Sequence, residues 1–201
     1  MLAHGRPGAF RIVGIGVSTG GPQALAEVIP RLPADLPVPV AIVQHMPPVF
    51  TASLARSLDK QSRLRVLEAE QGQRLEAGGV YVAPGGMHLA VAAQPGQAGP
   101  EFTALLVDGP PVNSCKPSVD VLFQSLAEAA GRGALALVMT GMGQDGLGGV
   151  EHIKRAGGYC ITQNRETCVV YGMPQVVDQA ELSDESLPLT ALAGRISTLV
   201  R

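Results

Sequence analysis

The sequence predicts an α/β fold built on a mostly parallel sheet, because apolar runs typical of buried strands alternate with helical patterns. Three of these runs, Arg11–Ile15, Val38–Val43 and Ala134–Met139, lead into short loops that carry polar side chains. In a parallel sheet the carboxyl ends of the strands meet at one edge, and open α/β sheets place their sites there. We therefore expect the three loops to lie together.

The first third of the chain repeats a strand–helix order. Gly20-Gly21-Pro22 follows the first strand, and a proline early in a helix is well tolerated because the first N–H groups lack an intrahelical partner. Besides the strands already named, this region is expected to hold two helices and a third strand: Gln23–Arg31, Val49–Asp59 and Leu64–Glu68.

The middle of the chain breaks this order. Residues 78–86, His88–Ala93 and Phe102–Val107 are short apolar segments separated by glycine and proline, with no room for a helix. They predict an antiparallel ribbon or the edge of a mixed sheet.

The strand–helix order resumes after Pro117. The expected elements are a helix to Ala130, the strand ending at Met139, and then Gly146–Arg155, Tyr159–Thr162, Pro174–Ala180 and Leu189–Leu199. With no internal repeat or linker, one domain over residues 11–201 is expected, after a flexible N-terminal lead-in of residues 1–10.

Composition excludes several classes of protein. The 201 residues are 46% hydrophobic, enough for one sizeable core, and the net charge of -2 argues against a nucleic-acid or anionic-membrane surface. No apolar stretch is long enough to cross a bilayer, and the N-terminus lacks the apolar core of a signal peptide. The three cysteines, Cys115, Cys160 and Cys168, form no CxxC pair and are typical of reduced thiols, so a cytoplasmic protein is expected.

The first loop admits two motif interpretations. Gly14-Ile15-Gly16-Val17-Ser18-Thr19-Gly20 approaches a dinucleotide fingerprint, but threonine stands where the last glycine belongs, and the second strand ends in Gln44-His45 instead of an acidic residue. The same segment satisfies G-x-S-x-G, a turn that exposes a serine hydroxyl above the sheet. The order Ser18, His45, Asp145 differs from the Ser, Asp, His order of α/β-hydrolases, and a lone G-x-S-x-G can be a simple turn.

Ser18, His45 and Asp145 are the candidate nucleophile, base and orienting carboxylate of a serine hydrolase. Of the four histidines, His45 alone ends a buried strand at the level of Ser18, whereas His88 is either structural or part of the cleft wall. Asp145 is also a candidate N-cap for the helix that begins at Gly146.

An oxyanion would be held by backbone N–H groups, for which Thr19 and Met142 are the candidates. Both residues lie in glycine-rich loops expected to face Ser18, and no lysine or arginine is near these loops in sequence.

Taken together, the loops resemble the catalytic domain of bacterial chemotaxis protein-glutamate methylesterases. The matching segments occur in family order from about residue 11 to the end: residues 15–22, 44–48, 83–85, 108–113, 117–123, 140–146 and 170–174. The family's catalytic serine, histidine and aspartate fall on Ser18, His45 and Asp145.

The resemblance implies a doubly wound, three-layer α/β/α domain with an antiparallel ribbon. It implies hydrolysis of glutamyl methyl esters on the cytoplasmic helices of methyl-accepting chemotaxis receptors, with deamidation of receptor glutamines in some members. No metal and no cofactor are expected, and no nucleic-acid partner or membrane insertion. The alternative is an adaptor that binds receptor-like helices without turnover, or that serves a non-chemotactic array.

Two departures from the family pattern matter for regulation and docking. The usual enzyme carries an N-terminal receiver domain, whereas about ten residues precede the first strand here, so we expect an isolated or stand-alone catalytic domain with an open cleft, or control by a separate regulator. Ser114-Cys115-Lys116 stands where relatives often carry a basic or histidine-rich stretch. The expected apolar rim of the cleft comprises Met46, Pro47, Met142 and Met173.

Overall fold

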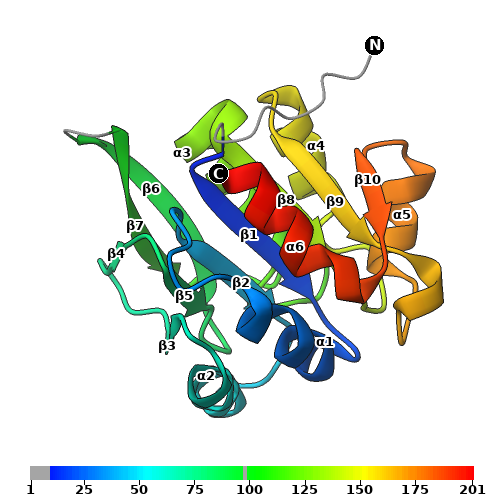
Figure 1. The fold of residues 1–201 in the computed structure, drawn as a ribbon, viewed down its shortest axis with the longest axis horizontal. Coiled ribbons are helices and arrows are strands. Elements are labelled where there is room, and N and C mark those ends of the chain that lie inside the picture. The colour runs from blue at the N-terminus through cyan, green and yellow to red at the C-terminus, as the bar shows by residue number, and fades with distance from the viewer. Residues whose placement is uncertain (1–9, 97–98) are drawn as a thin grey trace.

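The computed structural model describes residues 10–96 and 99–201 and contains a seven-stranded sheet, all of whose neighbouring strands run parallel (Figure 1). In spatial order its strands are β10 (Glu185–Leu187), β9 (Tyr159–Gln163), β8 (Ala134–Val138), β1 (Ile12–Val17), β2 (Val40–Gln44), β5 (Gly79–Val82) and β3 (Arg65–Glu68). The chain proceeds from β1 to one side of the sheet and later returns to β8 on the other side. The order therefore reverses between β1 and β8, and such a switch point is where open sheets bind ligands.

Helices cover both faces of this sheet, which gives the expected three layers. Side chains of α1 (Gly21–Val28), α2 (Phe50–Gln61) and α6 (Leu189–Val200) pack in one core with alternate residues of the central strands. Side chains of α3 (Val119–Ala130), α4 (Leu147–Arg155) and α5 (Met173–Gln179) pack in the other. Within the described residues no helix is long and apolar enough to span a membrane.

A second sheet of three strands lies beside α3. It consists of β4 (Arg74–Leu75), β7 (Gly99–Val107) and β6 (His88–Gly96), of which β6 and β7 form the antiparallel ribbon that the sequence predicts. The ribbon is joined to α3 by apolar packing and by the Val91 N–H, which donates to Ser125 Oγ at 2.9 Å. The remaining elements are short 3-10 turns at Ile29–Arg31, Gly131–Gly133 and Arg165–Thr167.

The α/β class and the doubly wound architecture are confirmed, but one segment was assigned to the wrong sheet. Residues 78–86 were expected in the ribbon or at the edge of a mixed sheet, whereas β5 lies inside the parallel sheet between β2 and β3. All four residues of β5 are buried, as befits a strand covered on both faces. Residues 1–9 of the expected lead-in lie outside the described residues, and Phe10 is buried against Tyr159.

Two glycines in β1 set the position of α3. A Cβ added at Gly14 would lie 2.4 Å from Leu126 Cδ1, and one added at Gly16 would lie 2.3 Å from Val119 Cγ1. Any larger residue at these positions would push α3 away from the sheet. The start of α3 is therefore fixed directly above the carboxyl end of β1.

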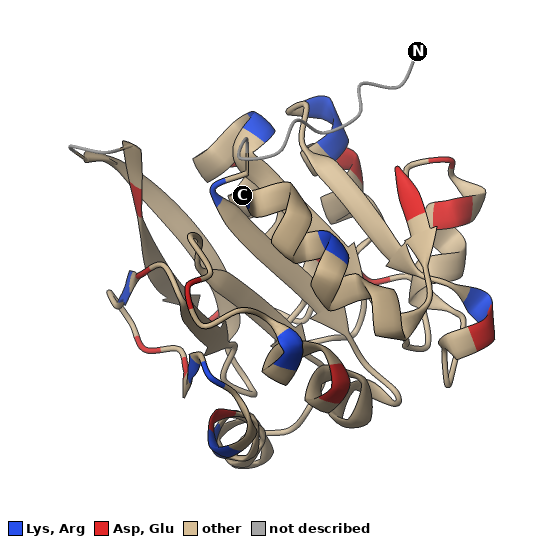
Figure 2. Cartoon of the chain, in the orientation of Figure 1, with Lys and Arg blue, Asp and Glu red and all other residues tan. Residues whose placement is uncertain are grey.

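Charged residues lie mainly on the helices and loops around this framework. Figure 2 marks positive and negative residues interspersed along the ribbon there, and β1, β2 and β8 contain none. The mixture agrees with the net charge of -2.

Candidate active site

The three sequence-predicted loops meet at the carboxyl edge of β2, β1 and β8. The Ser18 N–H donates to the Thr140 carbonyl at 3.0 Å, and the His45 N–H donates to the Val17 carbonyl at 3.2 Å. A Cβ added at Gly141 would lie 2.8 Å from Ser18 Cβ, so the loop after β8 runs close against the serine. The parallel register thus brings together residues that are far apart in the chain.

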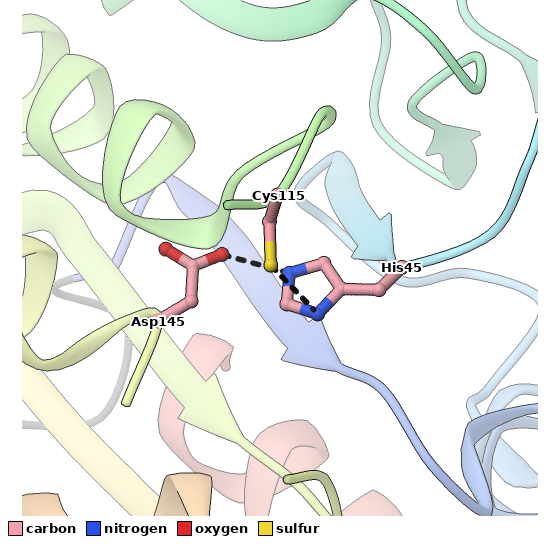
Figure 3. A group of neighbouring side chains, drawn as sticks. All are labelled: His45, Cys115 and Asp145. Atoms are coloured by element: carbon pink, nitrogen blue, oxygen red, sulfur yellow. Dashed lines mark hydrogen bonds and ion pairs between the residues drawn. The ribbon is translucent and has the colours of Figure 1, made fainter. Parts of the chain in front are cut away.

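His45 and Asp145 form a direct hydrogen bond (Figure 3). Nε2 of His45 lies 2.7 Å from Oδ2 of Asp145. Asp145 is 2% exposed, whereas His45 is half-buried and therefore still open to the cleft. The structure thus brings together the two side chains that the sequence predicts as base and orienting carboxylate.

Every other described partner of the Asp145 carboxylate is also a hydrogen-bond donor. The donors are Ser118 Oγ at 2.7 Å, the Val119 N–H at 2.7 Å, the Asp120 N–H at 3.1 Å and Asn113 Nδ2 at 3.2 Å. Burial raises the pKa of the Asp145 carboxyl, but the hydrogen bonds from His45, Ser118 and the other donors outweigh it and bring the pKa below its ordinary value. Asp145 is therefore an anion that accepts a hydrogen bond from the Nε2–H of His45, and the lone pair is on Nδ1, which forms a 3.6 Å hydrogen bond with Cys115 Sγ.

The predicted capping role of Asp145 applies to a different helix. The Asp145 carboxylate accepts hydrogen bonds from the first N–H groups of α3, and not from those of α4, which follows it in the chain. Asp120, in the first turn of α3, caps α4 in return. Its Oδ1 accepts hydrogen bonds from the Gly146 and Gly149 N–H groups at the start of α4, at 2.9 and 2.7 Å. The two helices exchange caps, and no local pattern in the sequence indicates this exchange.

Asn113 bridges the two capping carboxylates. Its Nδ2 donates to Asp120 Oδ2 at 2.6 Å as well as to Asp145. Burial raises the pKa of Asp120, and the nearby Asp145 charge raises it further. The amide of Asn113 offsets part of the repulsion between two carboxylates held this close.

The hydroxyl of Ser18 makes no side-chain hydrogen bond within the described part of the chain. Its backbone is well fixed, because its carbonyl accepts the Gly21 N–H at 2.8 Å and Gln44 Nε2 at 3.0 Å. The side chain is half-buried. The structure thus joins His45 to Asp145 by a hydrogen bond and places Ser18 on the adjoining loop without a bond to either.

The two candidate oxyanion donors are unengaged. Across residues 10–96 and 99–201, neither the Thr19 nor the Met142 N–H donates a backbone hydrogen bond. Both residues are exposed, Met142 at 76%. Gly20 and Gly143, which follow them, have φ of 81° and 93°, so each loop turns sharply just after its candidate donor.

His88 is structural. It is 2% exposed, its Nδ1 accepts the Ser118 N–H at 3.2 Å, and its Nε2 donates to the Pro110 carbonyl at 3.0 Å. Both ring nitrogens are satisfied, and the ring supports Ser118, which in turn donates to Asp145.

The expected apolar rim is partly wrong. Met142 and Pro47 are exposed and Met46 is half-buried, but Met173 is fully buried, because its sulfur fills the space beside Gly141. The exposed large apolar side chains that sequence reasoning missed nearby are Val49 at 76%, Phe50 at 57% and Val169 at 69%.

Four residues of the site were not predicted individually: Asn113, Cys115, Ser118 and Asp120. They lie in or between the segments 108–113 and 117–123 that carry the family resemblance, which was the available signal. Their roles depend on contacts with Asp145 and His45 across long stretches of chain, and no local pattern reveals such contacts.

Comparison with known proteins identifies the family. Residues 13–196 match the model of the CheB methylesterase family. A protein-glutamate methylesterase/protein-glutamine glutaminase of Desulfotalea psychrophila is 46% identical over 196 residues, covering 98% of this chain and 53% of the relative. A protein of the same description from Symbiobacterium thermophilum is 47% identical over 190 residues, covering 94% of this chain and 51% of the relative. The chain thus spans about half the length of these curated relatives.

A solved structure agrees over nearly the whole fold. The Thermotoga maritima CheB methylesterase catalytic domain superposes with a TM-score of 0.91 at 42% identity, covering 95% of this chain and 99% of that one. The chain belongs to the CheB methylesterase family.

Proposed function

We propose that residues 11–201 form a serine hydrolase domain that removes methyl groups from glutamyl methyl esters of chemotaxis receptors in the cytoplasm. The observation that carries the proposal is the His45–Asp145 hydrogen bond beside the loop of Ser18. The relatives' description as protein-glutamate methylesterase/protein-glutamine glutaminase supports both the ester substrate and a related deamidation of glutamine.

The first half of the reaction transfers the acyl group to the enzyme. Ser18 Oγ forms a bond to the ester carbonyl carbon while Nδ1 of His45 accepts the hydroxyl proton. Asp145 holds Nε2–H and stabilises the imidazolium that results. The tetrahedral intermediate then breaks its bond to the methoxy oxygen, which takes the proton from His45 and leaves as methanol.

The second half regenerates the serine. Water loses a proton to His45 and attacks the acyl carbon, and the bond to Ser18 Oγ breaks as that oxygen takes the proton back. The products are glutamate and free enzyme. In deamidation the same steps would release ammonia in place of methanol.

The Thr19 and Met142 N–H groups are the proposed oxyanion donors. Their support is that both lie in loops flanking Ser18 and that neither is engaged by another backbone group in the described chain. Donors of this kind act where negative charge develops in the transition state.

The proposed macromolecular substrate is a receptor helix that lies across the exposed apolar side chains of the site. Val49 and Phe50 follow the His45 loop, Met142 belongs to the Asp145 loop, and Val169 lies against Gly20. From here on, the apolar rim means Val49, Phe50, Met142 and Val169, in place of the four residues expected from the sequence. An apolar rim suits an amphipathic helix, whose own apolar face would be covered on binding.

The test is methanol release from methylated receptor by Ser18→Ala. This variant should lose activity and keep the wild-type circular dichroism and melting temperature, because Ser18 makes no side-chain hydrogen bond within the described chain. Ser57→Ala, an exposed serine on α2, is the matched control and should remain fully active. Near-normal turnover by a folded Ser18→Ala protein would refute the mechanism, and binding of receptor by inactive wild-type protein would support the adaptor alternative.

A further inference from the structure

Cys115 lies against the ring nitrogen that the proposed mechanism needs. Its Sγ is 3.6 Å from Nδ1 of His45, whereas Asp145 is bonded to Nε2 (Figure 3). A thiol, an imidazole and a carboxylate, each offering one metal-ligating atom, lie within 4.8 Å of one another. The thiol has no part in the reaction as proposed.

The position of the sulfur is fixed by a tight turn. Val112 and Cys115 exchange two backbone hydrogen bonds, at 3.1 and 2.8 Å, and Asn113 and Ser114 between them adopt φ of 49° and 62°. Asn113 is further held by both capping carboxylates. The sulfur therefore belongs to the same rigid network as Asp145.

The sulfur–nitrogen separation suits a tetrahedral cation. Zinc bonds of about 2.3 Å to sulfur and 2.0–2.1 Å to nitrogen, at the tetrahedral angle, separate the two ligand atoms by about 3.6 Å. A zinc-bound histidine usually donates its other ring N–H to a carboxylate, which fixes the tautomer. His45 already makes that bond to Asp145 through Nε2.

We propose that Cys115 Sγ and His45 Nδ1 form an inhibitory site for a thiophilic divalent cation such as Zn²⁺. Binding forms the Zn–S and Zn–N bonds and releases the thiol proton to solvent. The cation occupies the lone pair that would accept the Ser18 proton, so it stops catalysis. Water fills the remaining coordination positions.

The carboxylate of Asp145 adds a negative charge beside the two ligands. One of its oxygens lies within 4.8 Å of both the sulfur and the imidazole nitrogen. This charge attracts a divalent cation to the site.

Cobalt titration measures binding without reference to activity. Co²⁺ added to wild-type protein should give one equivalent of thiolate-to-metal charge-transfer absorption, and Ser18→Ala should give the same. Cys115→Ala should give none, while Cys168→Ala should behave as wild type, because Cys168 is equally half-buried but lies next to the Gln163 carbonyl. An unchanged band in folded Cys115→Ala, or no band in wild type, would overturn the proposal.

Zinc inhibition measures the consequence, and this part rests on the proposed function. Zn²⁺ should inhibit methanol release reversibly on addition of a chelator, and Mg²⁺, which prefers oxygen ligands, should not. The zinc concentration that halves methanol release should be at least about tenfold higher for Cys115→Ala than for wild type, with each protein compared with its own metal-free activity. Should Cys115→Ala not fold, Cys115→Ser serves in its place. A cobalt band without esterase activity in wild type would refute the proposed function alone, and equal zinc inhibition of both proteins would refute the inhibitory site alone.

Discussion

Asp145 has two roles that a single carboxylate rarely combines. It accepts Nε2–H from His45, and it caps α3 through the Val119 and Asp120 N–H groups. The sequence predicted a triad member and a helix cap at this position as compatible roles, but it assigned the cap to the helix that begins at Gly146. They coexist because the cap belongs to a helix that lies across the site, and sequence proximity could not indicate that helix.

Asp145→Asn should therefore lower both activity and stability. An amide NH₂ facing Nε2 would leave the Nδ1 position protonated, and a wrong tautomer of this kind costs about 10⁴-fold in serine proteases. The amide would also face donors, which should lower the free energy of unfolding by about 1–3 kcal/mol. Asp184→Asn, which weakens a buried bond to Lys154 elsewhere, should lower stability but leave methanol release unchanged. A variant that lost stability only would exclude the orienting role.

The stability difference between wild type and Asp145→Asn should depend on pH. Because the folded pKa of Asp145 lies below its ordinary value, its contribution is full above the unfolded pKa and is lost as pH falls through the folded pKa. Urea unfolding should show a larger difference at about pH 7 than at about pH 3. The Asp145 charge also raises the pKa of Asp120, so its removal relieves this repulsion and makes the difference at about pH 7 smaller than Asp145 alone would give.

At the scale of the elements, the order of strands and helices along the chain could be predicted from the sequence, but the order of the strands within the sheet could not. β1, β2 and β8 are apolar runs ended by glycine or polar loops, and the alternation with helices indicates that they run parallel. The pairing of β1 with β8, which lie far apart in the chain, has no such local sign. β5 looks like its ribbon neighbours, because short Gly- and Pro-bounded apolar segments carry no sign of their partners. β10 and β4 were missed because three and two residues are too short for any pattern.

Replacement of glycine by alanine should have opposite effects at Gly16, which packs against α3, and at Gly194, which has open space around it. Gly16→Ala should push α3 and its cap away from the sheet, lower stability by about 1–3 kcal/mol and reduce methanol release. Gly194→Ala, at an exposed position of α6 with open space around it, should raise stability by about 0.5–1 kcal/mol and leave activity unchanged. Thermal unfolding and methanol release on both variants measure this, and equal effects at the two sites would contradict the packing argument.

At the scale of the whole molecule, the carboxyl edge of the sheet differs from the opposite edge. The apolar rim gathers next to Ser18 and His45, while the opposite edge, where α6 ends beside the start of β1, buries Phe10 and Val200. Met173 shows the limit of sequence reasoning here. A methionine in a rim loop looked exposed, but the bare Cα of Gly141 leaves a space that its sulfur fills.

Phe50→Asp should therefore separate docking from chemistry. A charge on the rim should raise KM for methylated receptor and leave hydrolysis of a small glutamyl methyl ester unchanged. Thr198→Asp, an exposed residue of α6 toward the opposite edge, is the control and should change neither. If Phe50→Asp lost activity on both the methylated receptor and the small ester, this side chain would belong to the catalytic machinery and not to the docking surface.

The exchange of caps between α3 and α4 also bears on how the molecule fluctuates. Release of Asp145 leaves the first amides of α3 without acceptors, and release of Asp120 does the same to α4. Partial opening of either helix start therefore weakens the other, and the two behave as one cooperative unit. Because Asp145 belongs to that unit and also accepts the Nε2–H of His45, a fluctuation that loosens both helix starts frees the imidazole for as long as it lasts.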